Sequence, residues 1–388
     1  MIIRLLQAKV NALLKEFPAV TILGARQVGK TTLAKQVVAS LKKETLYLDL
    51  ENPLDYRKLE DAYSFLTEND DKCIIIDEVQ TMPTIFSVLR SVIDAKRTNG
   101  RFILLGSASP RLVKGVSESL AGRISYQELS PVNLFELPEK TRMNRHWLRG
   151  GFPGALLARS DAAAMMWMNG FARSYIERDL GNLFGVNLSQ FTIGRLMSML
   201  AHVNGNPWNA EMIARSLGIS APTVNRYVDY LEAAFIVHRL PAFFTNAGKR
   251  LVKAPKVYIR DSGLLHHLSS VNNMNDLKGH PIVGASWEGY VIEQIYQLIP
   301  QNLQLFYYRT QAGAECDIVI LKGMMPVACA EVKLSNAPSI SKGYYQSIDD
   351  LGTKKNFIIV PEVEEYKTKD KVIICSLKVF LKKYFLKL

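Results

Sequence analysis

One segment near the N-terminus, Gly24-Ala-Arg-Gln-Val-Gly-Lys-Thr31, constrains the fold of this chain more than any other feature. It fits the pattern GxxxxGK[ST] and lies between a short apolar run, Val20–Leu23, and a stretch with apolar residues at helical spacing. A buried strand that leads through a glycine-rich loop into a helix directs backbone N–H groups and the positive end of the helix at phosphates. Lys30 would reach the β- and γ-phosphates, and the Thr31 hydroxyl would bind Mg²⁺. We therefore expect ATP with Mg²⁺ at this loop.

A second apolar run, Cys73–Ile76, ends in two acids, Asp77 and Glu78. In P-loop proteins an acid at such a strand end holds Mg²⁺, and a neighbouring acid can polarise the attacking water. We assign the first role to Asp77 and the second, that of general base, to Glu78. The alternative is an acidic pair that only solvates a loop.

Two further polar residues are candidates for contact with the γ-phosphate. Ser107 follows the next apolar run and could act as a sensor there, although an ordinary serine at a strand end is the alternative. Arg123 could supply positive charge in cis or in trans, and a surface arginine is the competing interpretation. The expected nucleotide contacts are Gly24, Ala25, Arg26, Gln27, Val28, Gly29, Lys30, Thr31, Thr32, Asp77, Ser107 and Arg123.

The pattern of apolar residues divides the chain into three zones. Residues 1–145 alternate short apolar runs with helical stretches, which is typical of a parallel α/β sheet with helices on both faces. Residues 146–275 have a mostly helical period, and residues 276–388 begin with a helix and continue with strands. We expect these zones to be a P-loop ATPase domain, a helical segment and a second α/β domain.

Composition narrows the function classes without selecting one. The net charge of +12 favours a polyanionic partner such as DNA or an anionic membrane surface, although lysines on a solvated helix face would give the same balance. The four cysteines have no CxxC spacing, which argues against a zinc site and a disulfide framework. Because no run of about 18 apolar residues occurs, we expect no membrane span and a cytoplasmic protein.

Seven motifs together resemble a family of bacterial and archaeal AAA-type ATPases, in which a C-terminal domain of unknown function follows the ATPase. The resemblance covers nearly the whole chain and implies a winged-helix segment and a nuclease-like C-terminal domain. The motifs are Gly24–Leu33, Ile76–Gln80, Gly106–Ser109, Leu120–Arg123, Gly151–Pro153, Ile176–Asp179 and Lys256–Leu264.

The middle zone contains a helix–turn–helix pattern, Ala210–Leu217 followed by Ala221–Glu232. Gly218 permits the tight turn, and Ser220 can cap the second helix. The polar residues left outward on that helix include the three that we expect at nucleic acid, since such side chains contact bases and phosphates. Acidic neighbours would repel phosphates, so a contact with protein is the alternative. The three residues are Thr223, Asn225 and Arg226.

In the C-terminal zone, Asp317 lies in one predicted strand, Glu331 and Lys333 share one face of the next, and Glu288 lies in the helix that precedes them. This arrangement resembles the PD-(D/E)XK nuclease core, a restriction-endonuclease-like α/β fold, whose helix acid is matched by Glu288. In that chemistry Asp317 and Glu331, with Glu288, hold one or two Mg²⁺ or Mn²⁺ ions, and Lys333 orients or deprotonates water. Lesser candidates are Glu315 and Gln346. The alternative is a nuclease-like domain that binds without cutting.

Two interpretations of the whole chain remain open. In the first, ATP binding and hydrolysis control a DNA-binding and DNA-cleaving C-terminal module. In the second, ATP sets assembly with a protein partner, and the nuclease-like domain is a docking surface. A homo-oligomer is compatible with both, because AAA-type ATPases commonly assemble.

Overall fold

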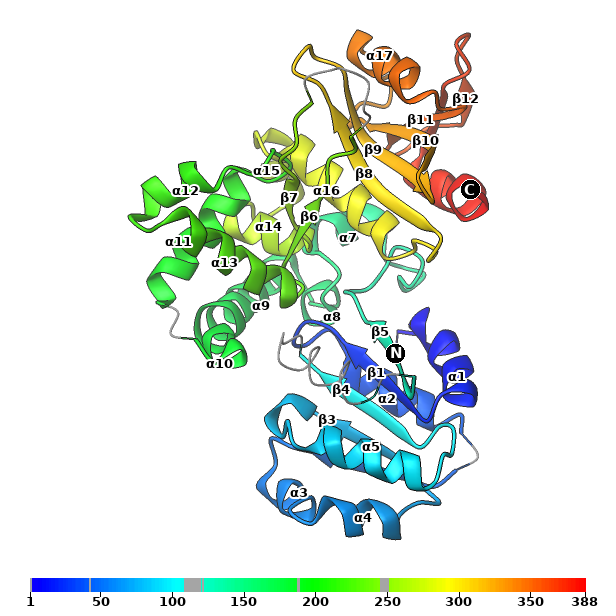
Figure 1. Ribbon diagram of the computed structural model, residues 1–388. Helices are drawn as coiled ribbons and strands as arrows, with labels where there is room; N and C mark the ends of the chain where they lie inside the picture. Colours follow the sequence, from blue (N-terminus) through cyan, green and yellow to red (C-terminus); the bar gives the residue numbers. More distant parts are fainter. Residues whose placement is uncertain (1, 42, 108–119, 121, 187–188, 245–250) are drawn as a thin grey trace.

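A parallel sheet of five strands forms the N-terminal part of the chain (Figure 1). The computed structural model describes residues 2–41, 43–107, 120, 122–186, 189–244 and 251–388. The strands are β1 (Ala19–Leu23), β2 (Thr45–Asp49), β3 (Cys73–Asp77), β4 (Phe102–Gly106) and β5 (Ile124–Glu128), in the order β2-β3-β4-β1-β5. All residues of β1, β3 and β4 are buried, which is why these parallel strands are nearly continuous apolar runs in the sequence.

Helices cover both faces of this sheet. Val10 and Leu33, from the first two helices, share a core with Ile22 of β1. On the other face, Leu89 of the fifth helix packs with Ile76 of β3. The predicted α/β sheet with helices on both faces is therefore confirmed. The helices are α1 (Leu6–Glu16), α2 (Lys30–Val38), α3 (Pro53–Lys58), α4 (Ala62–Glu68), the 3-10 turn η1 (Val79–Thr81) and α5 (Ile85–Ala95).

Within its described residues, the middle of the chain consists mainly of helices, with the antiparallel strand pair β6-β7. Gly218 ends α12 in the left-handed region with φ 69°, and Ser220 Oγ accepts the backbone N–H of Thr223 at 3.3 Å, so the local turn forms as expected. The elements are α7 (Met143–Arg149), α8 (Pro153–Leu156), α9 (Asp161–Phe171), the π-helix η2 (Ala172–Asp179), α10 (Leu180–Phe184), α11 (Gln190–His202), α12 (Ala210–Leu217), α13 (Ala221–Ala233), β6 (Val237–Leu240), β7 (Lys256–Ile259), α14 (Ser262–Leu268) and α15 (Met274–Gly279).

The C-terminal part is a mixed sheet of six strands in the order β12-β13-β11-β10-β9-β8. Trp287 of α16 packs on one face with Ile320, and Tyr344 of α17 packs on the other with Val319. The elements are α16 (Val283–Tyr296), β8 (Leu303–Arg309), β9 (Glu315–Lys322), β10 (Met325–Val332), α17 (Lys342–Leu351), β11 (Lys355–Val360), β12 (Tyr366–Lys367), β13 (Ile373–Ser376), α18 (Leu377–Val379), the π-helix η3 (Phe380–Tyr384) and the 3-10 turn η4 (Phe385–Lys387).

A buried polar chain joins the middle part to α16. Trp147 Nε1 donates to Ser286 Oγ at 2.9 Å, and Ser286 Oγ lies 2.6 Å from His266 Nε2. His266 Nδ1 reaches the carbonyl of Leu148 at 2.8 Å, so this nitrogen carries the proton and Nε2 accepts from the serine. The predicted boundaries after residues 145 and 275 fall inside α7 and α15, and they remain predictions about folding units.

The described residues also show the state of the cysteines and whether any helix could span a membrane. Each of the four cysteines is a buried free thiol. None of the helices in the described ranges combines the length and the apolar character that a bilayer span needs.

Candidate functional site

The P-loop follows β1 and leads into α2, and its two glycines are required by geometry. A Cβ at Gly24 would lie 2.3 Å from the carbonyl oxygen of Leu129, so the backbones approach too closely for any side chain. Gly29 has φ 101°, a conformation that side chains disfavour, and it directly precedes the first residue of α2. The loop therefore wraps the N-terminus of α2 as the sequence predicts.

Lys30 is buried at the first turn of α2. Its Nζ donates to the loop carbonyls of Gly24 at 3.0 Å and Ala25 at 3.2 Å. Burial lowers its pKa, while the nearby charges of Glu78 and Asp77 oppose this effect. The ammonium thus lies inside the loop, where phosphate oxygens could replace the two carbonyl acceptors.

Thr31 and Asp77 meet at the carboxyl end of β3. Thr31 Oγ1 donates to Asp77 Oδ2 at 2.7 Å, and the Tyr47 hydroxyl donates to the same oxygen at 2.7 Å. Burial, followed by the hydrogen bond to Asp77, raises the pKa of Tyr47. A hydroxyl beside a carboxylate is the pair that holds Mg²⁺ in P-loop sites, so these residues fit Mg²⁺ bound with a nucleotide.

The other acidic and polar residues predicted for the nucleotide site lie beside this pair. Glu78 adopts φ 50°, and Ser107 Oγ donates to Glu78 Oε2 at 3.1 Å. Gln80 also donates to this oxygen. Ser107 is fully buried at the end of β4, between β3 and β1 in the sheet. The structure therefore brings together Lys30, Thr31, Asp77, Glu78 and Ser107, whereas Ala108, Ser109 and Ala121 of the quoted motifs lie outside the described residues.

Arg123 lies at the opposite edge of the sheet. The residue after it, Ile124, pairs with Ala19 at the start of β1, whereas the P-loop follows Leu23 at its end. At about 3.3 Å per residue, β1 separates the two edges by roughly 13 Å. Arg123 instead donates to Asp94 at 2.6 and 2.9 Å. Of the two alternatives for Arg123, this position therefore disfavours action in cis, and action in trans stays a prediction.

Arg26 connects the P-loop to the middle of the chain. Its guanidinium donates to Asp179 Oδ2 at 2.6 Å and to Glu51 Oε1 at 2.7 Å. Asp179 is the last residue of the motif Ile176–Asp179, so the sequence marked it as a candidate functional residue. The sequence did not indicate that Asp179 pairs with Arg26. The nucleotide-binding loop and η2 are thus in direct ionic contact.

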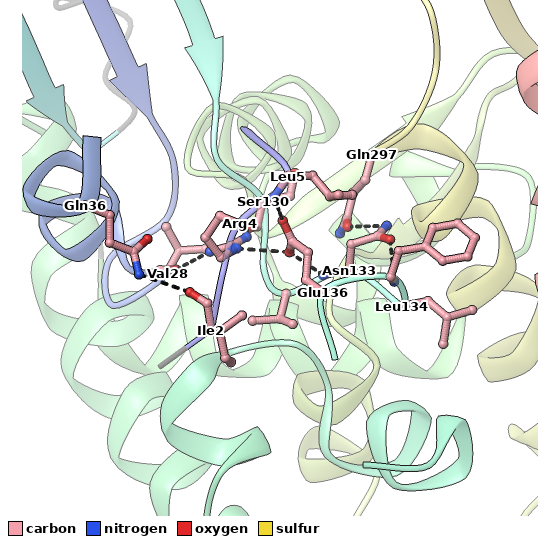
Figure 2. A network of polar contacts seen from close by, with 12 residues as sticks. Ile2, Arg4, Leu5, Val28, Gln36, Ser130, Asn133, Leu134, Glu136 and Gln297 are labelled. Atoms are coloured by element: carbon pink, nitrogen blue, oxygen red, sulfur yellow. Dashed lines mark hydrogen bonds and ion pairs between the residues drawn. The ribbon is translucent and has the colours of Figure 1, made fainter. Parts of the chain in front are cut away.

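A second route runs from the P-loop towards α16 (Figure 2). Arg4, which the sequence interpretation missed, donates to the carbonyl of Val28 at 3.1 Å and to Glu136 Oε2 at 2.9 Å. The same oxygen accepts the backbone N–H of Asn133, and the Asn133 amide donates to Gln297 Oε1 at 3.0 Å, directly after α16. The loop after β5 therefore contacts both Arg4, which is bonded to the P-loop, and Gln297 in the C-terminal part.

The predicted C-terminal acids converge on one cavity of about 650 Å³. Gln346 is not among its lining residues, and its amide donates to Asp350 instead. Asn204–Asn206 of the middle part form another portion of the wall, so the cavity is shared between the middle and C-terminal parts. The charged lining residues are Lys256, Glu288, Arg309, Glu315, Asp317, Glu331 and Lys333.

Lys256 at the start of β7 is the residue that the sequence interpretation did not assign. Its Nζ lies 2.9 Å from Glu288 Oε1, 3.3 Å from Glu315 Oε1 and 3.3 Å from Asp317 Oδ1. Burial opposes its charge, but Glu288, Asp317 and Glu315 together raise the pKa of Lys256. For Glu288, burial raises the pKa, the charge of Asp317 adds to this, and Lys256 opposes it. The centre of the cavity is thus an ammonium held by three carboxylates.

Glu331 and Lys333 form the other side of the cavity. Lys333 Nζ lies 2.7 Å from Glu331 Oε1, while Glu331 Oε2 is buried and has no hydrogen-bond partner. Asp317 Oδ2 accepts the backbone N–H of Val332 at 2.9 Å. Within the described ranges, no three His, Cys, Asp or Glu side chains are grouped to hold a metal ion. Asp317 and Glu331 both line the cavity, so their carboxylates are the candidates for holding a cation there.

The three residues expected at nucleic acid lie near the N-terminal half of α13. Asn225 and Arg226 are exposed, but the Asn225 side-chain oxygen accepts from Trp208 Nε1 at 2.8 Å. The Thr223 hydroxyl lies 2.8 Å from Ser220 Oγ. The repulsive acid Asp229 forms an ion pair of 2.7 Å with Arg239. Contact of the three residues with nucleic acid stays a prediction. Arg226 is exposed, whereas the side chains of Thr223 and Asn225 bond to neighbouring residues.

Three segments of the chain match models of known protein domains. Residues 16–137 match the AAA domain, residues 140–275 a domain of unknown function (DUF8612), and residues 283–380 a domain of unknown function (DUF4143). The uncharacterized protein Rv2008c of Mycobacterium tuberculosis is 39% identical over 366 residues, which is 94% of this chain and 81% of that protein. An uncharacterized protein of Haemophilus influenzae is 22% identical over 307 residues, or 70% of this chain and 75% of the relative.

Among solved structures, the Walker-type ATPase of Pyrococcus abyssi is similar with a TM-score of 0.45 and 16% identity. The similarity covers 68% of this chain and 94% of that protein.

Proposed function

Because this chain belongs to the same family as the uncharacterized mycobacterial protein Rv2008c, and its residues 16–137 match an AAA domain, we propose that it hydrolyses ATP and that its nucleotide state controls a DNA-directed C-terminal module. The observation that carries the first half is the contact of 2.7 Å between Thr31 and Asp77, beside the buried Lys30. The second half rests on the convergence of Glu288, Asp317, Glu331 and Lys333 in one cavity.

In the ATPase site, each group has a position suited to one task. Lys30 binds the phosphates, and Thr31 and Asp77 hold Mg²⁺, which when bound neutralises phosphate charge. Glu78 orients and deprotonates the attacking water, with Ser107 fixing one of its oxygens. In an assembly of several copies, Arg123 would face a neighbouring site rather than its own.

The C-terminal cavity supports an activity on a phosphodiester. Asp317 and Glu331 would hold one divalent cation, which when bound stabilises charge on the phosphate. Lys333 lies next to Glu331 and orients the water that attacks phosphorus. The net charge of +12 and the exposed Arg226 on α13 favour a polyanionic partner such as DNA.

Coupling between the two sites would run through α16. Arg260 directly follows β7 and donates to Glu128 at the end of β5 at 2.6 Å and to Glu293 of α16 at 2.9 Å. The same helix carries Glu288, and the Arg4 route of Figure 2 reaches the residue after its C-terminus. A shift of the loop after β5 on nucleotide binding would thus be transmitted to the acidic cavity.

A second candidate function is a regulatory switch in which the C-terminal domain only docks a partner. The observation that favours it is the Lys256 ammonium at the centre of the acids, since a neutralised cavity needs no metal. DNA affinity separates the two candidates. The proposal requires binding at low salt that weakens steeply as salt rises, whereas no binding at low salt would support the switch.

The decisive experiment incubates plasmid DNA with Mg²⁺ or Mn²⁺, with and without ATP. We expect nicking or cleavage that depends on the metal and changes with ATP, and that is lost in Asp317→Ala and Lys333→Ala. Gln346→Ala, outside the cavity, is the matched control and should cleave normally. Cleavage that survives both cavity substitutions would assign the activity to another site or a contaminant.

A further inference from the structure

The acidic cavity already contains one cation, the ammonium group of Lys256. Three carboxylate oxygens surround it, from Glu288, Glu315 and Asp317, at 2.9, 3.3 and 3.3 Å. The side chain of Lys256 is only 3% exposed, so water contributes little to its solvation. Oxygen ligands from two or three carboxylates around one cation are what a divalent metal ion requires as well.

Lys256 comes from a different element than the acids around it, since Glu315 and Asp317 lie on β9 and Glu288 lies on α16. Lys256 and Tyr258 lie two residues apart on β7 and therefore point to the same face. Both donate to Glu288, with the Tyr258 hydroxyl bonded to the same oxygen as Lys256 Nζ. Strand β7 thus supplies a positive group that lines the cavity, together with a second hydrogen-bond donor to Glu288, the acid on α16.

The carboxylate of Glu331, by contrast, is only partly paired. Glu331 is 7% exposed, and its Oε2 is a buried oxygen without a hydrogen-bond partner. Lys333 neutralises only the other oxygen. The cavity therefore has one cation position filled by the protein and one carboxylate oxygen that still lacks a partner.

We propose that Lys256 is a resident cation that takes the place of one divalent metal ion, so that the C-terminal site accepts a single metal ion between Asp317 and Glu331. The inference rests on the proposed function, because it takes the cavity as a site for divalent cations. It explains why Glu288 can be present without serving as a metal ligand, since its carboxylate is held by Lys256 and Tyr258.

The test counts bound Mn²⁺ by electron paramagnetic resonance in nucleotide-free protein that carries Thr31→Ala, so that the P-loop adds no metal. We expect this parent to bind one Mn²⁺ and Lys256→Met to bind one more. Lys342→Met, at an exposed lysine on α17 beside the cavity, is the matched control and should bind the same number as the parent.

Removing a buried charge could prevent folding, so a milder variant and a second readout accompany the count. In Lys256→Gln the amide can still donate to a carboxylate, and we expect the same additional Mn²⁺. Its unfolding temperature in EDTA should lie below that of the parent, and Mn²⁺ should raise it by more than it raises that of the parent. Equal rises in both proteins would contradict a vacated cation position.

The results can distinguish a failure of the role of Lys256 from a failure of the metal site itself. One Mn²⁺ in the parent and one in both Lys256 variants, at unchanged affinity, would overturn the role of Lys256 and leave the metal site intact. No Mn²⁺ in the parent or in either variant would overturn both the inference and the metal-dependent part of the proposed function.

Discussion

Arg26 in the P-loop and Asp179 at the end of η2 form an ion pair of 2.6 Å, although 153 residues separate them in the sequence. Glu51 accepts from the other terminal nitrogen of the same guanidinium. A nucleotide phosphate at the loop would compete with these carboxylates for Arg26. If Arg26 contacts the nucleotide as we propose, the ion pair with Asp179 sets the middle part of the chain in competition with ATP.

This competition predicts opposite effects of two substitutions. Asp179→Asn removes a competing charge, so ATP affinity should rise about two- to fivefold, the range expected for a partly exposed ion pair worth up to about 1 kcal/mol. Arg26→Ala would remove the proposed phosphate ligand and should weaken binding. Titration with a fluorescent ATP analogue measures both. If Asp179→Asn weakens ATP binding as much as Arg26→Ala does, the pair supports the loop and does not compete.

Lys30 and Glu78 should separate ATP binding from ATP hydrolysis. Lys30→Ala removes the buried ammonium of the loop and should abolish detectable binding. Glu78→Gln keeps shape and hydrogen bonding but not basicity, so it should bind ATP normally and lose turnover by about 10²-fold or more. Calorimetric binding and phosphate release give the two readouts. Turnover equal to that of the wild type in Glu78→Gln would refute the assignment of the general base.

The close approach at Gly24 predicts a strong effect of a single methyl group. Gly24→Ala would bring a Cβ to 2.3 Å from the carbonyl of Leu129, so the loop or the segment after β5 must move. We expect loss of ATP binding and a destabilisation of about 1–3 kcal/mol, as for other overpacked sites. Gly170→Ala in α9 meets nothing within 4 Å and is the matched control, because a helical glycine gains stability from this change. Thermal unfolding and ATP titration would show whether the two variants differ.

The sequence predicted best what is encoded within a few residues. The P-loop, the acids at the end of β3 and the turn at Gly218 are local patterns, and the parallel sheet follows from fully buried apolar runs. The role of Lys256 could not be predicted because its carboxylate partners lie on elements far along the chain, with Asp317 61 residues away. The spacing of residues in the sequence does not show which distant elements pack together. The sequence left open whether Arg123 acts in cis or in trans, because a motif shows no strand direction, and direction decides which edge of the sheet a residue occupies.

The buried His266 predicts that acid destabilises the chain. Burial lowers its pKa from 6.5 to about 4, while the hydrogen bond to Leu148 opposes this. Between these values the unfolded chain binds the proton and the folded chain does not. The stabilisation is therefore complete above pH 6.5 and is lost as pH falls towards 4, by about 3 kcal/mol in all.

A glutamine at this position isolates the effect of the proton. In His266→Gln the amide can donate to the Leu148 carbonyl and accept from Ser286, but it cannot titrate. The variant should be less stable than the wild type at pH 7.5, and this deficit should shrink by up to about 1.4 kcal/mol per pH unit below 6.5. Asp261, whose pKa burial raises to about 6, contributes the opposite slope, so only the difference between the two proteins reports on His266. Urea titrations from pH 7.5 to 5 measure it, and a deficit that stays constant with pH would show that the imidazole is not protonated on unfolding.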